Sequence, residues 1–155
     1  MRYEKITVDT SIGPVGAVIG GVDLSHELSE QVIQEIHHAW LQHHVVFFRN
    51  QYLSPQQQAD FSARFGELDV YPFMQPVDGH PNVIPIIKEA SAKLNFGGAW
   101  HTDTSYKQLP PKATVLYALE VPEKGGDTLF ADATFAYESL SMGLRACLEG
   151  LTRSE

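Results

Sequence analysis

Hydrophobic and polar positions follow two different periods over the first third of the chain. Short apolar and β-branched runs at 6–8 and 15–24, interrupted by glycine and proline, predict two strands separated by a turn. Ser29 is then placed to cap a helix, because the apolar residues that follow it recur at helical spacing. These residues are Val32, Ile33, Ile36, Ala39 and Trp40.

A third strand and a second helix are predicted next. The β-branched and aromatic run at 45–49 indicates the strand. Ser54 stands at an N-cap position, with Pro55 at the first helical position and Gln57 at the capping-box position. Gly66 is the predicted end of this helix.

The second half of the chain has a less regular pattern. Prolines and glycines interrupt residues 70–99, apart from a short predicted strand at 83–87. Two extended segments, 113–121 and 127–133, are joined by "PEKGG" and predict an antiparallel hairpin. The apolar residues after them recur at helical spacing and predict two short helices divided at 141–143.

We find no internal repeat or linker, so these elements predict a single domain over residues 1–155. A content of 43% hydrophobic and 19% charged residues is typical of a soluble globular protein. With eleven basic against nineteen acidic residues, the net charge of -8 argues against a nucleic-acid partner and against an anionic membrane surface. It favours a small-molecule or protein partner.

Cysteine content and the first residues predict the compartment. One cysteine excludes an intramolecular disulfide framework, and "MRYEKITVDT" is not a charged-then-apolar leader. Apolar runs such as "VVFF" are too short to cross a bilayer. The cytoplasm is therefore the expected location, with no membrane partner.

The stretch "FGGAWHTDTSY" at 96–106 carries the candidate chemistry. On a strand, His101 and Asp103 would project to the same side. Together with a second histidine they would form the 2-His-1-carboxylate triad, which leaves positions on Fe(II) open for a co-substrate and dioxygen. A solvated histidine beside an aspartate remains an alternative, as does a zinc site, for which one His and one Asp are a thin ligand set.

Motifs that span nearly the whole chain occur in this order: "VGAVIGGVDLS", "HHVVFFRNQYLSPQQQADFSARFGEL", "AWHTDTSY" and "GGDTLF". Through these motifs the chain resembles the Fe(II)/2-oxoglutarate-dependent taurine dioxygenase family, which includes chlorophenoxyacetate and alkylsulfate dioxygenases. The resemblance implies a mainly β fold with flanking helices, the double-stranded β-helix, also called jelly-roll or cupin-like, here expected to be incomplete.

The resemblance also implies roles for individual residues. His101 and Asp103 match the first two iron ligands of the family, on the strand that begins the β-helix. Thr128 matches the threonine whose hydroxyl helps to hold the distal carboxylate of 2-oxoglutarate. The implied reaction is oxidative decarboxylation of 2-oxoglutarate by O2, coupled to hydroxylation of a small, anionic organic substrate.

Three positions are candidate substrate contacts. Tyr71 stands where taurine dioxygenases carry a sulfonate-contacting histidine, and Gly97 stands where they carry an asparagine. Thr104 is a third candidate lining residue, for which a structural role is an equal alternative. Because a site that lacks polar partners does not select for a polar substrate, taurine itself is not expected.

The chain departs from the family in length. Family members are about twice as long, and their second iron-binding histidine and the arginine that pairs with 2-oxoglutarate have no match in residues 1–155. No histidine follows His101, and the six upstream histidines do not match the missing ligand. We therefore expect the N-terminal portion of a dioxygenase domain.

An alternative is a non-catalytic truncated relative that acts as a binding or oligomerising module. Exposed sheet edges would then pair with another chain, for example in a homo-oligomer.

Overall fold

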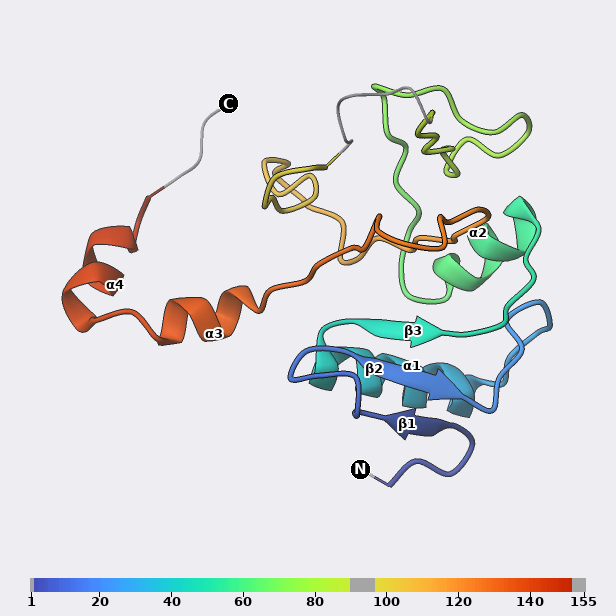
Figure 1. Ribbon diagram of the computed structural model, residues 1–155, viewed down its shortest axis with the longest axis horizontal. Coiled ribbons are helices and arrows are strands. Elements are labelled where there is room, and N and C mark those ends of the chain that lie inside the picture. The colour runs from blue at the N-terminus through green and yellow to red at the C-terminus, as the bar shows by residue number, and fades with distance from the viewer. Residues whose placement is uncertain (1, 90–96, 152–155) are drawn as a thin grey trace. The chain divides into compact units, whose positions relative to one another are not determined.

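The computed structural model describes residues 2–89 and 97–151 (Figure 1). The described residues separate into two compact units. One unit comprises the chain up to Tyr52 together with the chain from Ala118 onwards, and the other comprises Leu53–Tyr117.

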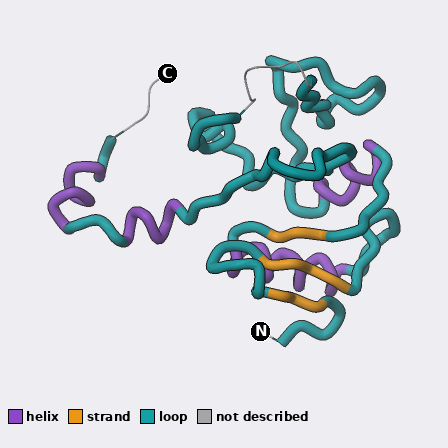
Figure 2. The backbone as a smooth tube through the Cα atoms, in the orientation of Figure 1, coloured by secondary structure: helices purple, strands orange, loops and turns teal. Residues whose placement is uncertain are grey.

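The first unit contains a three-stranded mixed sheet, drawn as the orange segments in Figure 2. β1 (Thr7–Asp9) pairs antiparallel with β2 (Ala17–Gly20), and β2 pairs parallel with β3 (Val46–Phe48). The parallel pairing requires a crossover, which α1 (Glu30–His43) supplies. All three strands predicted in this part of the chain are confirmed.

α1 begins where the sequence predicts, because the Ser29 side chain accepts a hydrogen bond from the backbone N–H of Val32. Ile33, Ile36 and Ala39 are buried on one face, so the predicted apolar stripe is confirmed. The helix ends at His43. The next residue, His44, is its C-cap, with a positive φ of 67° and a backbone N–H that donates to the carbonyl of Trp40.

A buried carboxylate fixes the N-terminal segment to α1. Glu35 is 1% exposed, and its carboxylate accepts the backbone N–H groups of Glu4, Lys5 and Ile6 at 3.0 to 3.2 Å. Burial of Glu35 by itself raises the pKa of the carboxyl, but the backbone donors and the Gln31 amide outweigh it and lower the pKa. The buried charge is therefore compensated.

In the second unit, α2 (Pro55–Ala63) has the predicted capping box, in which the side chains of Ser54 and Gln57 each accept the other residue's backbone N–H. The helix ends at Ala63, before the predicted stop at Gly66, and its Phe61 is buried.

The C-terminal part forms two short helices, as predicted. α3 (Ala133–Glu138) and α4 (Met142–Leu148) follow each other, with Asp132 and Ser141 as N-caps. Met142 and Gly143 lie inside α4, so the division falls at 139–141 rather than at 141–143. Within the described part of the chain no helix has the length and apolar character needed to cross a membrane.

Two strand predictions are wrong in this structure. Residues 83–87 form no strand, because Pro85 lacks a backbone N–H and no strand in the described part of the chain pairs with the segment. Residues 113–121 and 127–132 form no strand either, and Ala133 belongs to α3, so the hairpin predicted over 113–121 and 127–133 is not formed. Val121 and Leu129 are 70% and 72% exposed, and a two-stranded hairpin without a buried face is at best marginally stable.

Candidate metal centre

His101 and Asp103 lie side by side in an irregular loop of the second unit. Nε2 of His101 is 3.2 Å from Oδ1 of Asp103, and about half of each side chain is exposed. The predicted strand at this position is wrong. A turn at Thr104, which has a φ of 45° and whose carbonyl accepts the Lys107 N–H, shapes the loop just after the pair.

The loop is attached to the chain that precedes it. Lys107 forms an ion pair with Asp69, and this contact holds the pKa of the Asp69 carboxyl below its usual value. The Asn82 side chain donates to the carbonyl of Asp69 at 3.0 Å. These contacts connect three irregular segments of the second unit without any strand pairing.

A hydrogen bond from Nδ1 to a backbone carbonyl orients the His101 ring. Nδ1 donates to the carbonyl of Ala99 at 2.8 Å, so a neutral imidazole presents the lone pair of Nε2 to Asp103. Two lone pairs 3.2 Å apart repel each other unless they share a proton or a metal cation. Two donors bound at about 2.1 Å on adjacent octahedral corners lie about 3.0 Å apart. The pair therefore fits two neighbouring positions on a divalent metal.

The carboxylate of Asp103 is held on its other side as well. Oδ2 accepts a hydrogen bond from the hydroxyl of Thr114 at 3.0 Å. Oδ1 is the oxygen that faces His101. No group of three or more His, Cys, Asp or Glu side chains arranged for a metal occurs among residues 2–89 and 97–151. The described residues thus form a half-site of two donors.

The predicted substrate contacts fall in different surroundings. Gly97 takes a φ of 67°, and a Cβ at this position would lie 3.1 Å from Cε1 of His101. The Tyr71 ring packs edge-on against Phe73, with centroids 5.4 Å apart. Gly97 therefore lies where a side chain would meet the His101 ring, and the roles of Gly97 and Tyr71 as substrate contacts stay predictions.

Thr128, the predicted contact to 2-oxoglutarate, belongs to the first unit, whereas His101 and Asp103 belong to the second. Its backbone is irregular and its side chain is exposed. The role of Thr128 in binding 2-oxoglutarate therefore stays a prediction.

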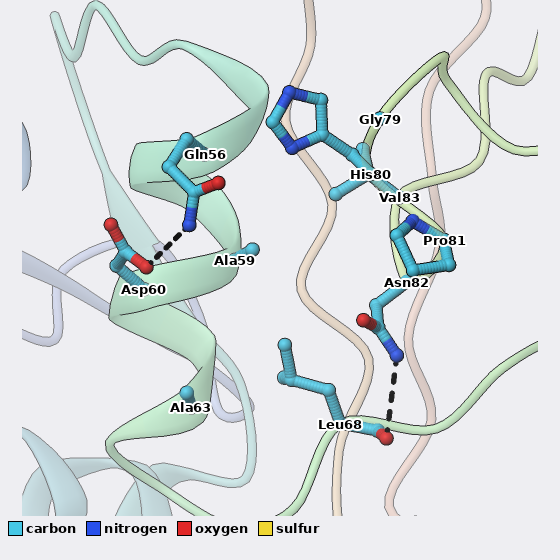
Figure 3. A pocket seen from close by; sticks show the side chains of 10 residues that line it. All are labelled: Gln56, Ala59, Asp60, Ala63, Leu68, Gly79, His80, Pro81, Asn82 and Val83. Carbon is cyan, nitrogen blue, oxygen red and sulfur yellow. Dashed lines mark hydrogen bonds between the residues drawn. The ribbon is translucent and has the colours of Figure 1, made fainter.

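A small pocket of about 150 Å³ lies elsewhere in the second unit, between α2 and the loop at 79–83 (Figure 3). Gln56 and Asp60, joined by a 2.7 Å hydrogen bond, line the helix side, and His80 lies on the loop side. None of the six predicted site residues lines this pocket. The pocket is therefore separate from the metal half-site.

Two groups that shape the half-site were missed by the sequence argument. The carbonyl of Ala99 orients His101, and the hydroxyl of Thr114 holds Asp103. A backbone carbonyl carries no sequence signal. Thr114 stands eleven residues after Asp103, where only the three-dimensional contact identifies it.

An imidazole and a carboxylate at this distance are a ligand pair that a non-haem metal site could use, and the role of His101 and Asp103 as metal ligands stays a prediction. The chain belongs to the taurine catabolism dioxygenase TauD, TfdA family, whose model matches residues 4–155. Fe(II) and 2-oxoglutarate are the metal and the co-substrate of this family, and the fit of His101 and Asp103 to a divalent metal agrees with it.

Individual relatives agree with the family. The alkylsulfatase of Acinetobacter baylyi is 37% identical over 152 residues, which are 97% of this chain and 45% of that protein. The alpha-ketoglutarate-dependent sulfate ester dioxygenase of Pseudomonas putida is 33% identical over 148 residues, 95% of this chain and 48% of that protein. The chain thus spans about half the length of the curated relatives it matches.

Solved structures show the same relationship. A taurine dioxygenase from Burkholderia xenovorans superposes with a TM-score of 0.81 at 39% identity, over 95% of this chain and 52% of that one. The small sheet with flanking helices is therefore the fold of a taurine dioxygenase over the matched residues.

Proposed function

We propose that this chain is the N-terminal portion of an Fe(II)- and 2-oxoglutarate-dependent dioxygenase, which hydroxylates a small anionic organic substrate. The observation that carries the proposal is the His101–Asp103 pair, whose Nε2 and Oδ1 atoms lie 3.2 Å apart in a chain of this family. The complete domain would be a double-stranded β-helix, to which residues 1–155 contribute a part.

Each predicted residue has a defined task in this proposal. His101 and Asp103 would bind Fe(II), and the Ala99 carbonyl keeps the His101 proton on Nδ1 so that Nε2 is free to bind. The hydroxyl of Thr128 would donate to a carboxylate oxygen of 2-oxoglutarate. When bound, the metal and co-substrate supply the oxidation in which O2 converts 2-oxoglutarate to succinate and CO2 and hydroxylates the substrate.

The third ligand and the arginine for 2-oxoglutarate would come from sequence outside residues 1–155. Support comes from the relatives, of which this chain covers 45% and 48%, and from the two-donor half-site in the described residues. The reading frame downstream of Glu155 tests this part. A histidine followed closely by an arginine in a strand-like context is expected, and a stop codon there would contradict it.

We propose a sulfate ester as the substrate class. Two relatives are named for sulfate esters, and both are similar over at least 95% of this chain. Tyr71 and Gly97 also replace the histidine and the asparagine that a taurine site is expected to have at these positions, so taurine itself is not favoured. With the intact protein, succinate formation should be faster with an alkyl sulfate than with taurine or a phenoxyacetate, and a preference for taurine would overturn this assignment.

Spectroscopy on the chain itself tests the half-site. Under anaerobic conditions, Fe(II) and 2-oxoglutarate are expected to give a weak visible charge-transfer band, which His101→Ala abolishes. Thr102→Val serves as the control, because the Thr102 hydroxyl bonds Ser105 at 2.6 Å and not the metal pair. A wild-type chain without the band would argue against a working site in these residues.

A second candidate function, a non-catalytic oligomerising module, is favoured by one observation. Large apolar side chains are exposed in the segments between 115 and 130, among them Leu119 at 86% and Leu129 at 72%. Such side chains would pack against a second copy of the chain. Size-exclusion chromatography with light scattering distinguishes the two, because a monomer that binds Fe(II) supports the dioxygenase and a metal-free oligomer supports the module.

A further inference from the structure

The carboxylate of Asp103 is contacted at both oxygens. Oδ1 lies 3.2 Å from Nε2 of His101, whereas Oδ2 accepts the Thr114 hydroxyl at 3.0 Å. The two oxygens therefore differ: Oδ1 faces the position where a metal would also contact His101, whereas Oδ2 is hydrogen-bonded to Thr114. Thr114 has no role in the site described above beyond this contact.

The segment that carries Thr114 is attached to α2 and its N-terminal end. The Gln58 side chain donates to the carbonyl of Val115 at 3.1 Å, and the backbone N–H of Leu53 donates to the Tyr117 hydroxyl at 3.2 Å. Gln58 belongs to α2, whose start is fixed by the capping box. The Thr114 hydroxyl is therefore positioned by a helix outside the loop that holds His101 and Asp103.

Holding one carboxylate oxygen changes how the other can bind. A free aspartate rotates about its side-chain bonds and binds a cation through one oxygen or through both. With Oδ2 accepting from Thr114, Oδ1 is presented to the position that it shares with His101. Ligating carboxylates are commonly oriented in this way, and loss of such a partner typically weakens metal affinity.

We propose that Thr114 is a positioning residue that holds Asp103 for one-oxygen binding of a divalent metal. This inference rests on the proposed function, because it takes His101 and Asp103 as metal ligands. Thr114 itself touches neither the metal nor a substrate. Its side chain is exposed, so its hydrogen bond contributes little to folding and its removal leaves the fold intact.

The experiment measures Mn(II) binding to the full chain by the loss of the free-ion signal in electron paramagnetic resonance. Thr114→Val keeps the side-chain shape and removes the donor, and it should raise the Kd for Mn(II) about 10-fold or more. Thr114→Ser restores the hydroxyl and should return the Kd to within about 3-fold of the wild-type value. Thr102→Val, the matched control, should leave the Kd unchanged, and all variants should unfold at the wild-type temperature without metal.

The outcomes separate this inference from the function on which it rests. Equal Kd values for wild type and Thr114→Val, with binding lost in His101→Ala, would overturn the role of Thr114 alone. No Mn(II) binding by the wild-type chain, or equal binding by wild type and His101→Ala, would overturn the metal half-site of His101 and Asp103 and with it the role of Thr114, whereas the family of the chain does not depend on this result. If Thr114→Val weakens Mn(II) binding and Thr114→Ser does not restore it, the positioning role of Thr114 would also be overturned, because the loss of affinity would not come from the missing hydroxyl.

Discussion

The imidazole of His101 is bounded closely by its own loop. Its Nδ1 bonds the carbonyl of Ala99, and its Cε1 lies 3.1 Å from the place where a side chain at Gly97 would begin. The left-handed φ of 67° at Gly97 is one that glycine adopts without steric cost. Both the backbone conformation and the neighbouring ring therefore favour glycine at this position.

We predict that Gly97→Ala displaces the His101 ring and raises the Kd for Mn(II) about 10-fold. The reason is the 3.1 Å contact, which is tighter than ordinary van der Waals distance and involves a ring held by a hydrogen bond. Mn(II) titration by electron paramagnetic resonance measures the change.

Gly79→Ala is the matched control for that prediction. Gly79 has a similar φ of 77° in the same unit, but no atom lies within 4 Å of its added Cβ. Both variants should lose about 1 kcal/mol of stability from backbone strain, while Mn(II) affinity should fall only in Gly97→Ala. Equal affinity in the two variants would show that the ring contact is unimportant.

At the scale of single residues, the two-residue spacing predicts that His101 and Asp103 share one face of a strand, whereas an irregular loop brings them together. Their closeness is observed, and their role as metal ligands stays a prediction. Thr114 was missed because its partner lies eleven positions away and no pattern joins them. The buried carboxylate of Glu35 was missed because its hydrogen-bond partners are backbone N–H groups, which leave no signal in a sequence.

Among the elements, α2 depends on its first turn. We predict that Ser54→Ala lowers the free energy of unfolding by about 1 kcal/mol, because it removes the acceptor for the Gln57 N–H. Ser62→Ala is the control, since the Ser62 hydroxyl donates to the Gln58 carbonyl of the same helix and is not needed to begin it. Chemical denaturation measures both, and a larger loss in Ser62→Ala would contradict the prediction.

The contact between α1 and the N-terminal segment should depend on pH. The pKa of Glu35 lies below its ordinary value of 4.5 in the folded chain, so its contribution to stability is present above that value. It is lost as the pH falls through the lowered pKa. Glu35→Gln should lower the unfolding temperature by on the order of 5 °C at pH 7, because an amide accepts these backbone donors less strongly than a carboxylate.

Thermal unfolding between neutral and acid pH checks this. The difference between wild type and Glu35→Gln should shrink as the pH drops below 4.5. A difference that stays constant over this range would show that packing, and not the charge of Glu35, is responsible.

The helices with local start signals and the three strands of the first unit could be predicted, whereas the strand predictions in the second half of the chain were wrong. Ser29 and Ser54 each bond a backbone N–H three positions away, so a short window of sequence contains the whole signal. The predicted hairpin at 113–133 has the β-branched and aromatic residues of strands, but its stability would depend on a third strand or a covering layer. The pattern of apolar and polar residues in the two segments does not show whether a third strand or a covering layer is present.

In the molecule as a whole, buried side chains are concentrated in the first unit's sheet and α1. By contrast, Lys112 and Lys124 lie in exposed stretches that are neither helix nor strand. We predict that limited trypsin digestion cuts after these two lysines at least about 10-fold faster than after Lys5, whose backbone N–H is held by Glu35. Mass spectrometry of early digests checks the order, and first cleavage after Lys5 would contradict it.

The buried side chains of the first unit all come from a short stretch of the chain, from Ile6 to Ala39. β1, β2, α1 and β3 likewise follow one another between Thr7 and Phe48. Contacts this close in sequence form quickly, and domains begin to fold during synthesis from the N-terminus. On a ribosome β1, β2, α1 and β3 have all been synthesised before His101 or Asp103 is added, so this sheet can begin to form ahead of the candidate metal pair.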